Sequence, residues 1–160
     1  MKIAEDSFFK ECKKFEDLEK KLFQKIKNLR DSVKGDKVYD DNKIDKESVH
    51  LTIFLESDLI AYSRLYKSSK CEVSLQRFSV AQKYRNIGIS KILMNFIFLN
   101  TKKIFNKSSL ILTSRLKTKE FYEKYDFEVY DVKKENSLDR FYMMRDLKIS
   151  PHIKSIKTIF

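Results

Sequence analysis

Hydrophobic and polar side chains alternate with two different periods along this chain, and the first period is helical. Apolar residues between positions 8 and 29 recur at steps of three and four, which predicts an amphipathic helix over about residues 5–30. Residues 31–48 are polar and include an acidic run, so they predict a solvated loop. The acidic run lacks the central glycine and distal glutamate of an EF-hand at the required offsets, so it does not indicate a calcium site.

The period then changes to two, which is the period of β-strands. Segments 49–56 and 58–66 alternate between apolar and polar residues and predict an antiparallel hairpin. A third strand over residues 71–80 begins with apolar residues at odd positions and ends with them at even positions. One extra residue in a strand produces such a slip, so we predict a β-bulge near Gln76 and Arg77.

The second half of the chain alternates helices with strands. We predict a helix at about 88–102, a strand at 109–114, a short helix at 116–125 and strands at 127–134 and 140–148. Alternation after the third strand implies parallel pairing there through a crossover. The expected fold is therefore α/β, or α+β, with a mixed central β-sheet and flanking helices. We expect one domain over residues 1–147, followed by a short basic tail at 148–160.

Composition limits the classes of function. A chain of 160 residues that is 42% hydrophobic is long enough to bury a core. No apolar run reaches the length of a membrane span, and the N-terminus lacks the apolar segment of a signal peptide. We therefore expect a cytoplasmic protein that makes no membrane contact. Cys12 and Cys71 fit reduced thiols of that compartment, and neither has partners at metal-ligand spacing, so no metal is expected.

The net charge of +11 is concentrated in one region. Residues 73–119 contain ten Lys or Arg and no Asp or Glu, whereas the remaining 24 basic residues nearly balance the 23 acidic ones. A region of this kind predicts an anionic ligand. A solvated basic face is the alternative interpretation.

Gly88, one of only two glycines, lies where the helical pattern of residues 88–102 begins. The N-terminus of a helix exposes unpaired backbone N–H groups and the positive end of the helix dipole, so it can bind an anion. A side chain at Gly88 would keep a phosphate away from these groups. Arg85 adds positive charge beside it and Ser90 adds a hydroxyl donor. A helix that merely begins with a glycine is the alternative.

The segment FSVAQKYRNIGISKILM resembles the acyl-CoA-binding motif of the GNAT superfamily of N-acetyltransferases. That motif is a strand, then Q/R-x-x-G-x-G/A, then a helix, and here it reads Arg85-Asn86-Ile87-Gly88-Ile89-Ser90. Downstream, KEFYEKYDFEVY is similar to the second conserved block of the family. The resemblance covers about residues 20–147. The resemblance is strongest to the ElaA-type subfamily. Four stretches carry it: NLRDSV, HLTIFLESDLIAYSRLY, the Arg77 strand and RFYMMR.

The chain departs from the family pattern at three places. Ser90 replaces the last small residue of the motif, and Asp126 replaces the glycine of the second block. Serine is small, and aspartate is among the few residues that tolerate a left-handed backbone at a helix end. Val33 runs directly into KGDKVYDD, so the V-F-x-x-E-Q stretch of ElaA-type proteins is missing or shortened. Because that stretch helps to line the acceptor side, the acceptor is left open.

The resemblance implies transfer of an acetyl group from acetyl-CoA to a primary amine of a small molecule or peptide, by direct attack. It implies a bulged strand that splays away from its parallel neighbour, with the pantetheine arm in the gap. It assigns cofactor binding to Phe78, Ser79, Val80, Arg85, Asn86, Ile87, Gly88, Ile89 and Ser90. It also implies that Tyr122 donates a proton to the leaving thiolate, whereas helical spacing alone favours a core aromatic there.

The general base stays open. Glu72 lies at the start of the bulged strand, where some family members place a carboxylate, and a surface ion pair with Lys70 is its structural alternative. His50 lies on a strand that is expected to face the cleft, and a hydrogen-bonded structural histidine is the alternative there. A chain of water molecules could replace either base.

Two other functions remain as alternatives. The first is a catalytically degenerate GNAT domain that binds CoA. The second is a small basic nucleic-acid-binding module, which ranks last because no RNP-type aromatic pattern, KH loop or zinc spacing is present. The sequence does not identify the amine acceptor, and it leaves open a homodimer formed through an exposed edge strand near the C-terminus.

Overall fold

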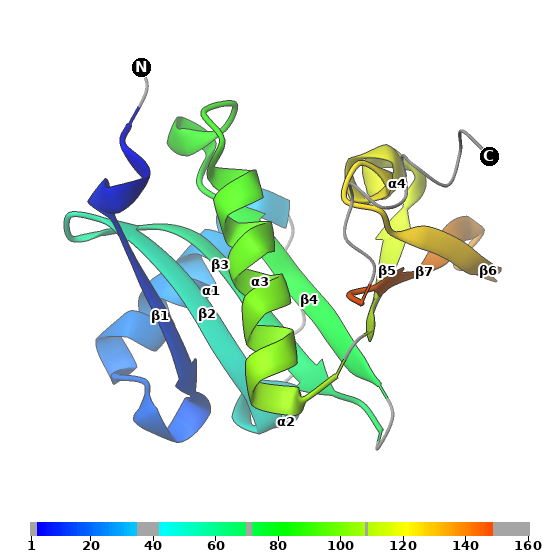
Figure 1. Ribbon diagram of the computed structural model, residues 1–160, viewed down its shortest axis with the longest axis horizontal. Helices are drawn as coiled ribbons and strands as arrows, with labels where there is room; N and C mark the ends of the chain where they lie inside the picture. Colours follow the sequence, from blue (N-terminus) through cyan, green and yellow to red (C-terminus); the bar gives the residue numbers. More distant parts are fainter. Residues whose placement is uncertain (1–2, 35–41, 70–71, 108, 149–160) are drawn as a thin grey trace. The chain divides into compact units, whose positions relative to one another are not determined.

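The computed structural model describes residues 3–34, 42–69, 72–107 and 109–148, and they form two compact units (Figure 1). The first unit is made of Met1–Lys67 and Leu75–Asn100, and the second of Ser68–Ser74 and Thr101–Phe160. The single domain expected over residues 1–147 spans both units and stays a prediction. The tail expected at 148–160 lies outside the described residues after Lys148.

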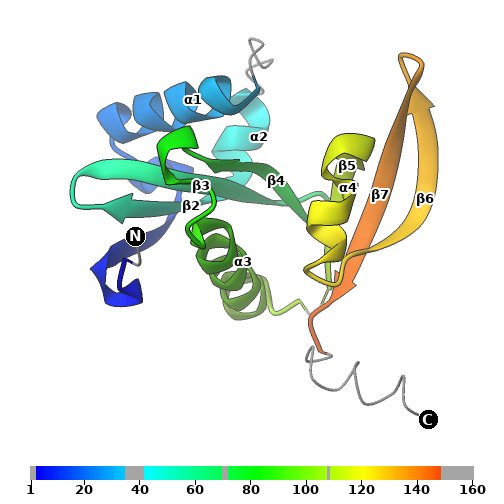
Figure 2. The ribbon, with the colours of Figure 1, turned by 90° about the horizontal axis from the view of Figure 1, so that it is seen from above.

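The first unit is a sheet covered on both faces by helices. Its strands follow the order β1 (Phe8–Lys14), β2 (Ser48–Leu55), β3 (Asp58–Lys67) and β4 (Val73–Val80). Antiparallel pairing places Cys12 opposite Leu51 and Val49 opposite Leu65. Helices α1 (Lys20–Lys34) and α2 (Asn42–Glu47) lie on one face, and α3 (Ile89–Phe105) lies on the other (Figure 2). The described residues of this unit also form three short 3-10 helices: η1 (Glu5–Ser7), η2 (Phe15–Asp17) and η3 (Gln82–Tyr84).

Buried aliphatic side chains from the sheet and from both helical layers form the core of this unit. They include Ile26, Leu51, Ile53, Ile60, Leu65, Ile89, Leu93, Met94 and Ile97, all at most 1% exposed. Burying a side chain of this size contributes about 1.5–3 kcal/mol. The alternating segments predicted as strands thus form β2 and β3, and the apolar stripe predicted for residues 88–102 forms the buried face of α3.

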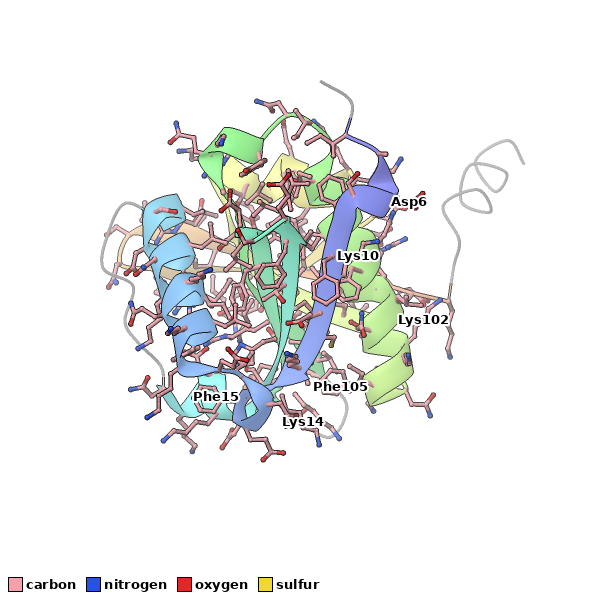
Figure 3. The ribbon with its side chains drawn as sticks, turned by 90° about the vertical axis from the view of Figure 1, so that its left-hand side faces the viewer. Asp6, Lys10, Lys14, Phe15, Lys102 and Phe105 are labelled. Carbon is pink, nitrogen blue, oxygen red and sulfur yellow. The ribbon has the colours of Figure 1, made fainter. Side chains whose placement is uncertain are left out.

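The prediction of one helix over residues 5–30 is wrong in its first part. Residues 8–14 form β1, an edge strand that pairs with β2 along its whole length. Apolar residues four apart, such as Phe8 and Cys12, also lie on one face of a strand, so the spacing did not distinguish the two structures. Figure 3 shows Lys10 and Lys14 on this strand. Lysines on an edge strand discourage pairing with another chain.

The loop predicted over residues 31–48 is also wrong at both ends. Helix α1 continues to Lys34, and α2 occupies residues 42–47. Residues 35–41, with most of the acidic run, lie outside the described residues. Asp45, on α2, is fully buried instead of solvated, because it pairs with two arginines of α1 and β3.

β4 departs from regular strand geometry at the residue where the sequence predicts a bulge. Arg77 has φ 57°, a left-handed conformation that occurs at some bulges and is uncommon for residues other than glycine. Before it the buried residues are Val73 and Leu75, and after it they are Ser79 and Val80. The change of phase in the sequence therefore marks a real irregularity of the strand.

The second unit is an antiparallel sheet with one helix. Its strands follow the order β5 (Ser109–Arg115), β7 (Leu138–Asp146) and β6 (Glu128–Glu135), and its helix is α4 (Leu116–Glu123). Ser74, at the start of β4, pairs with Ile111 of β5 in parallel, as predicted, and the described residues form a mixed sheet of seven strands in the order β1-β2-β3-β4-β5-β7-β6. Asn136 and Ser137 both have positive φ and form the two-residue hairpin turn between β6 and β7.

Candidate cofactor and catalytic site

The predicted cofactor-binding residues lie at the end of β4, in the turn that follows and in the first turn of α3. The end of the strand is buried, since Ser79 is 2% and Val80 is 6% exposed. Residues 85–88 form a turn, and α3 begins at Ile89. The Arg85 side chain contacts the end of β4, because its Nε donates a hydrogen bond to the Val80 carbonyl oxygen at 3.1 Å. The motif is therefore fixed directly against the end of β4.

Gly88 has the conformation and the open surroundings that the anion-site hypothesis requires. Its φ is 91°, and a Cβ built on it would meet no heavy atom within 4 Å. Asn86, two residues earlier, is also left-handed, with φ 63°. Turns that contain left-handed residues can direct successive backbone N–H groups at one anion. The structure thus leaves room for a ligand directly in front of the glycine.

The first turn of α3 adds hydrogen-bond donors at this place. The Gly88 carbonyl oxygen accepts the Ile92 N–H at 3.3 Å, so the helical hydrogen-bond ladder begins there. The N–H groups that precede Ile92 in this turn have no carbonyl partner within the helix. They also lie at the positive end of the helix dipole. Donors of this kind at a helix start can bind an anion.

β4 itself contributes Phe78, Ser79 and Val80, which follow the irregularity at Arg77. Phe78 is half-buried. The Ser79 hydroxyl donates to the Arg77 carbonyl oxygen at 3.0 Å, and the Ser63 hydroxyl of β3 donates to the Gln76 carbonyl oxygen at 2.9 Å. These two bonds fix the backbone on either side of the left-handed residue.

A buried charged cluster, which the sequence did not predict, lies beside this part of β4. It consists of Arg30, Asp45 and Arg64, none of which is more than 2% exposed. Arg30 Nη1 donates to both Asp45 oxygens, at 2.9 and 3.1 Å, and Arg64 Nη1 donates to Asp45 Oδ1 at 2.7 Å. Arg64 Nε also donates to the Gln76 side-chain oxygen at 2.9 Å, which connects the cluster to β4.

The two arginines keep Asp45 ionised. Burial alone would raise the pKa of this carboxyl group, but the hydrogen bonds and positive charges of Arg64 and Arg30 outweigh it, so the pKa lies below its ordinary value.

His50 is 1% exposed, and both of its ring nitrogens have hydrogen-bond partners. A carbonyl oxygen only accepts, so Nε2 donates to the Asp45 carbonyl at 2.8 Å and Nδ1 accepts from the Tyr62 hydroxyl at 2.8 Å. The rings of Phe15 and Phe23 pack against the imidazole. No ring nitrogen is left to take a proton from an amine. This geometry favours the structural interpretation of His50 over the basic one.

The buried imidazole gives a prediction for the dependence of stability on pH. Burial lowers the pKa of His50 below 6.5, so the unfolded chain binds this proton more readily than the folded protein. The contribution of neutral His50 to the free energy of unfolding is therefore fully present above pH 6.5. It decreases as the pH falls from 6.5 to the lowered pKa of the folded protein, by about 1.4 kcal/mol for each pH unit. Urea denaturation at pH 7.5 to 5.0 should show this loss, and His50→Gln should reduce its slope. An equal slope in both proteins would contradict the assignment.

Glu72 and Tyr122, the other two predicted catalytic residues, belong to the second unit. Glu72 is exposed and directly precedes β4. The pKa of Tyr130 on β6 is raised by burial and, next, by the negative charge of Glu72, so the carboxylate lies near that ring. Lys70, the ion-pair partner considered for Glu72, lies outside the described residues.

Tyr122 lies on α4 in an aromatic cluster. Its ring packs edge-to-face against Phe121 at 5.1 Å and against Phe127 at 5.9 Å between ring centroids. Burial raises the pKa of its phenol to about 12, so the hydroxyl keeps its proton at neutral pH. Asp126, which ends this helical region, has φ 65°, the left-handed conformation expected where the family has glycine.

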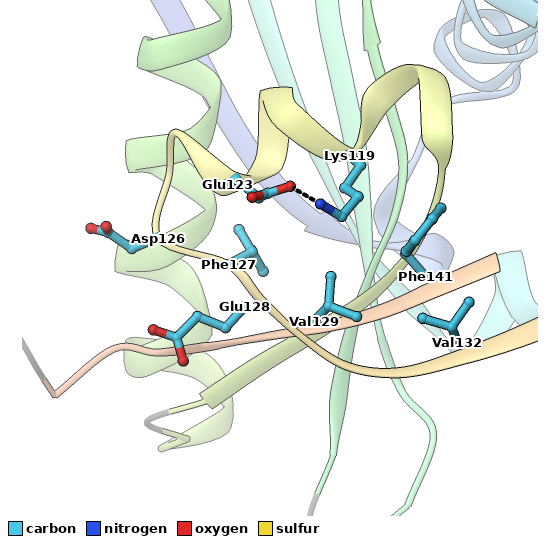
Figure 4. A pocket seen from close by; sticks show the side chains of 8 residues that line it. All are labelled: Lys119, Glu123, Asp126, Phe127, Glu128, Val129, Val132 and Phe141. Carbon is cyan, nitrogen blue, oxygen red and sulfur yellow. Dashed lines mark hydrogen bonds and ion pairs between the residues drawn. The ribbon is translucent and has the colours of Figure 1, made fainter. Parts of the chain in front are cut away.

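A pocket of the second unit, of about 530 Å³, involves none of the predicted residues (Figure 4). Its lining comes from α4, β6, β7 and the α4–β6 connection: Lys119, Glu123, Asp126, Phe127, Glu128, Val129, Val132 and Phe141. Lys119 and Glu123 form an ion pair beside it.

Two absences concern only the described part of the chain. Within it, no group of three or more His, Cys, Asp or Glu side chains could hold a metal ion. No helix among these residues is both long enough and apolar enough to cross a membrane.

One comparison with known proteins identifies a family. A family model described as an acetyltransferase (GNAT) domain matches residues 19–147. A search of curated protein sequences found no significant match.

Several solved structures have a fold similar to that of this chain. An acyl-CoA N-acyltransferase from Pseudomonas aeruginosa is 22% identical, with a TM-score of 0.76, over 87% of this chain and 99% of that one. Escherichia coli ElaA is 18% identical, with a TM-score of 0.77, over 87% and 99%. A GNAT family acetyltransferase from Elizabethkingia anophelis with acetyl-CoA bound is 16% identical, with a TM-score of 0.72, over 89% and 100%.

Proposed function

Because the chain belongs to the acetyltransferase (GNAT) domain family, we propose that it transfers the acetyl group of acetyl-CoA to a primary amine by direct attack. Within the family we propose an ElaA-like member, on the strength of its sequence resemblance to that subfamily. The similarity of the fold to Escherichia coli ElaA supports this placement.

The turn that begins α3 is the observation that carries the proposal. Gly88 combines a left-handed φ of 91° with open space where a side chain would lie. The helix dipole and the unpaired N–H groups of the first turn make this an anion site. In the proposal, residues 85–90 bind the pyrophosphate of the co-substrate, and residues 78–80 of β4 bind its pantetheine arm.

Positioning of the reactants supplies much of the proposed catalysis. Holding an amine and a thioester in a reactive geometry contributes on the order of 7–11 kcal/mol. A backbone N–H group of residues 78–80 is the proposed donor to the thioester oxygen, which gains negative charge in the transition state. With both His50 nitrogens engaged, Glu72 or a water chain remains as the proposed base that takes the proton of the amine.

Tyr122 is the residue that we propose to assist the leaving sulfur. The pKa of its phenol decides whether it transfers a proton or only donates a hydrogen bond. Full proton transfer from a phenol with a pKa of about 12 to a thiolate whose thiol has the ordinary pKa of about 8.5 is unfavourable by about 5 kcal/mol. We therefore propose that Tyr122 donates a hydrogen bond to the sulfur as charge develops, without releasing its own proton.

Tyr122→Phe is expected to lower kcat about 100-fold while the KM for acetyl-CoA changes less than about threefold, because only the hydroxyl of a packed ring is removed. The matched control is Tyr125→Phe, which removes a half-buried hydroxyl from the same end of α4 and should leave kcat unchanged. Steady-state release of free CoA thiol measures both. An unchanged kcat in Tyr122→Phe would show that another group assists the sulfur.

Titration with CoA and with single-stranded RNA across a range of salt concentrations separates the alternatives. The proposal predicts saturable binding of CoA at one site with a raised melting temperature, and release of CoA thiol with a responsive amine. CoA binding without thiol release over a broad amine panel would indicate a degenerate domain. RNA binding with a steep salt dependence and no CoA binding would indicate a nucleic-acid module.

A further inference from the structure

Strand β6 is an exposed edge of the sheet in the second unit. It is the last strand in the sheet order, and β7 is its only strand neighbour among the described residues. Figure 2 shows it on the outer side of the β6–β7 hairpin. All eight of its residues, Glu128–Glu135, are exposed. A strand of this kind presents backbone N–H and C=O groups with which another strand can pair.

The register between β6 and β7 shows which of these backbone groups point outward. A two-residue turn connects the strands, so Glu135 and Leu138 beside it form a hydrogen-bonded pair, and such pairs alternate along the hairpin. Val132, three residues before Glu135, is therefore in a non-hydrogen-bonded pair, and its N–H and C=O point away from β7. In agreement, the Val132 N–H donates to Asp131 Oδ1 at 2.9 Å.

The same residue also brings apolar surface to this edge. The Val132 side chain is 49% exposed, and that of Val129 is 36% exposed. Both line the pocket between β6 and α4 (Figure 4). A further strand beside β6 would remove part of this apolar surface from water, which favours association.

The charges on either side of Val132 make the strand complementary to itself. Asp131 and Lys133 are both exposed and lie on the same face, 3.8 Å apart. In an antiparallel pair of two β6 strands with Val132 opposite Val132, each Asp131 faces Lys133 of the other copy. A shift by two residues keeps the outward groups paired but places Asp131 opposite Asp131, or Lys133 opposite Lys133. Opposite charges stabilise such pairs and like charges destabilise them, so one register is favoured.

We propose that β6 pairs antiparallel with β6 of a second copy of this chain, about a two-fold axis at Val132. The Val132 N–H then donates to the Val132 carbonyl oxygen of the other copy, and Asp131 exchanges its bond to that N–H for the second Lys133. Lysines usually protect an edge strand, but here each Lys133 faces an aspartate. The two-fold axis closes the assembly at two copies. The proposal specifies the homodimer that the sequence left open, and it does not depend on the proposed function.

Sedimentation velocity of the unmodified protein tests the dimer. Between about 1 μM and about 1 mM, we expect the mass to change from that of the monomer to twice that value. A monomer at every concentration would overturn the inference and would leave this edge to a strand of another protein.

Val132→Pro tests whether the outward N–H of β6 holds the dimer. Proline removes this N–H, which does not pair with β7, and proline is tolerated at such positions of edge strands. The dimer Kd should rise at least 10-fold. Val132→Thr keeps the N–H and the branched shape, and it should leave the Kd within about threefold. Circular dichroism and the melting temperature check that both variants are folded. An unchanged dimer in folded Val132→Pro would overturn the inference.

Charge reversal tests the register without relying on a single variant. Asp131→Lys and Lys133→Asp each place like charges opposite one another in a homodimer, so each should raise the dimer Kd at least 10-fold. An equal mixture of the two variants should form heterodimers with a Kd within about threefold of the unmodified protein. In the mixture the introduced lysine of one chain faces the introduced aspartate of the other. Single variants that dimerise normally, or a mixture that stays monomeric, would overturn the proposed register.

Discussion

Asp45→Asn is expected to lower the free energy of unfolding by about 3–5 kcal/mol, the largest stability change that we predict for a single substitution. The carboxylate is fully buried and binds Arg30 and Arg64 at 2.7 to 3.1 Å. An amide keeps the shape of the side chain but removes the charge that holds two buried guanidinium groups. Urea denaturation at pH 7.5 measures the change.

Two controls make this prediction specific to the buried pairing. Asp31→Asn, at an exposed position of α1, removes the same charge and should change stability by less than about 0.5 kcal/mol. Arg30→Met should lower the free energy of unfolding less in the Asp45→Asn background than in the unmodified protein. In that background the Arg30 charge has already lost the carboxylate that compensates it. A loss of less than about 1 kcal/mol in Asp45→Asn would contradict the cluster as described.

Gly88→Trp is expected to weaken CoA binding at least 100-fold, which corresponds to about 2.7 kcal/mol. The space in front of Gly88 contains no heavy atom within 4 Å of an added Cβ, so an indole would fill the volume that we assign to the pyrophosphate. Isothermal titration with CoA measures the affinity, and circular dichroism checks that the variant is folded.

Backbone strain and blocked space can be distinguished at this residue. Gly88→Ala places an L-residue at φ 91°, which costs about 1–3 kcal/mol of stability, but its methyl group meets no neighbour. It should therefore lower the melting temperature and weaken CoA binding less than tryptophan does. Asn95→Trp, at an exposed position of α3, controls for a large aromatic side chain on this helix. CoA binding by Gly88→Trp at the unmodified affinity would contradict the site.

The sequence contained enough information to predict most of the strands and the cofactor motif. β2 and β3 alternate between apolar and polar residues although both of their faces are buried, and this pattern is local to each strand. The phase slip of β4 is equally local, and Arg77 lies at it with φ 57°. Gly88 was recognisable because the chain has only two glycines, so its place at a helix start required a reason.

The first strand and the short α2 helix could not be predicted in this way, because their structure depends on tertiary contacts. β1 exists through its pairing with β2, whose residues lie about forty positions later along the chain. Asp45 is one of several acids in a polar segment, and only the folded arrangement of α1, α2 and β3 distinguishes it from a solvated neighbour.

Predictions for the site succeeded where they followed the backbone and were weaker where they depended on side-chain partners. The left-handed conformation of Asp126 follows from the resemblance, because this residue stands where the second block of the family has glycine. His50 lies on the predicted strand, but its partners, Tyr62 and the Asp45 carbonyl, come from two other elements. A signal was available for Arg64, since strand alternation places it on the same face as Tyr62, which is buried.

A crystal structure of the protein with coenzyme A bound would test most directly whether the start of α3 binds the pyrophosphate. We predict phosphate oxygens within hydrogen-bond distance of backbone N–H groups of residues 88–90, in the space that Gly88 leaves open. A coenzyme whose pyrophosphate lies elsewhere, with the turn at residues 85–88 covered by the protein's own side chains, would contradict the proposed function.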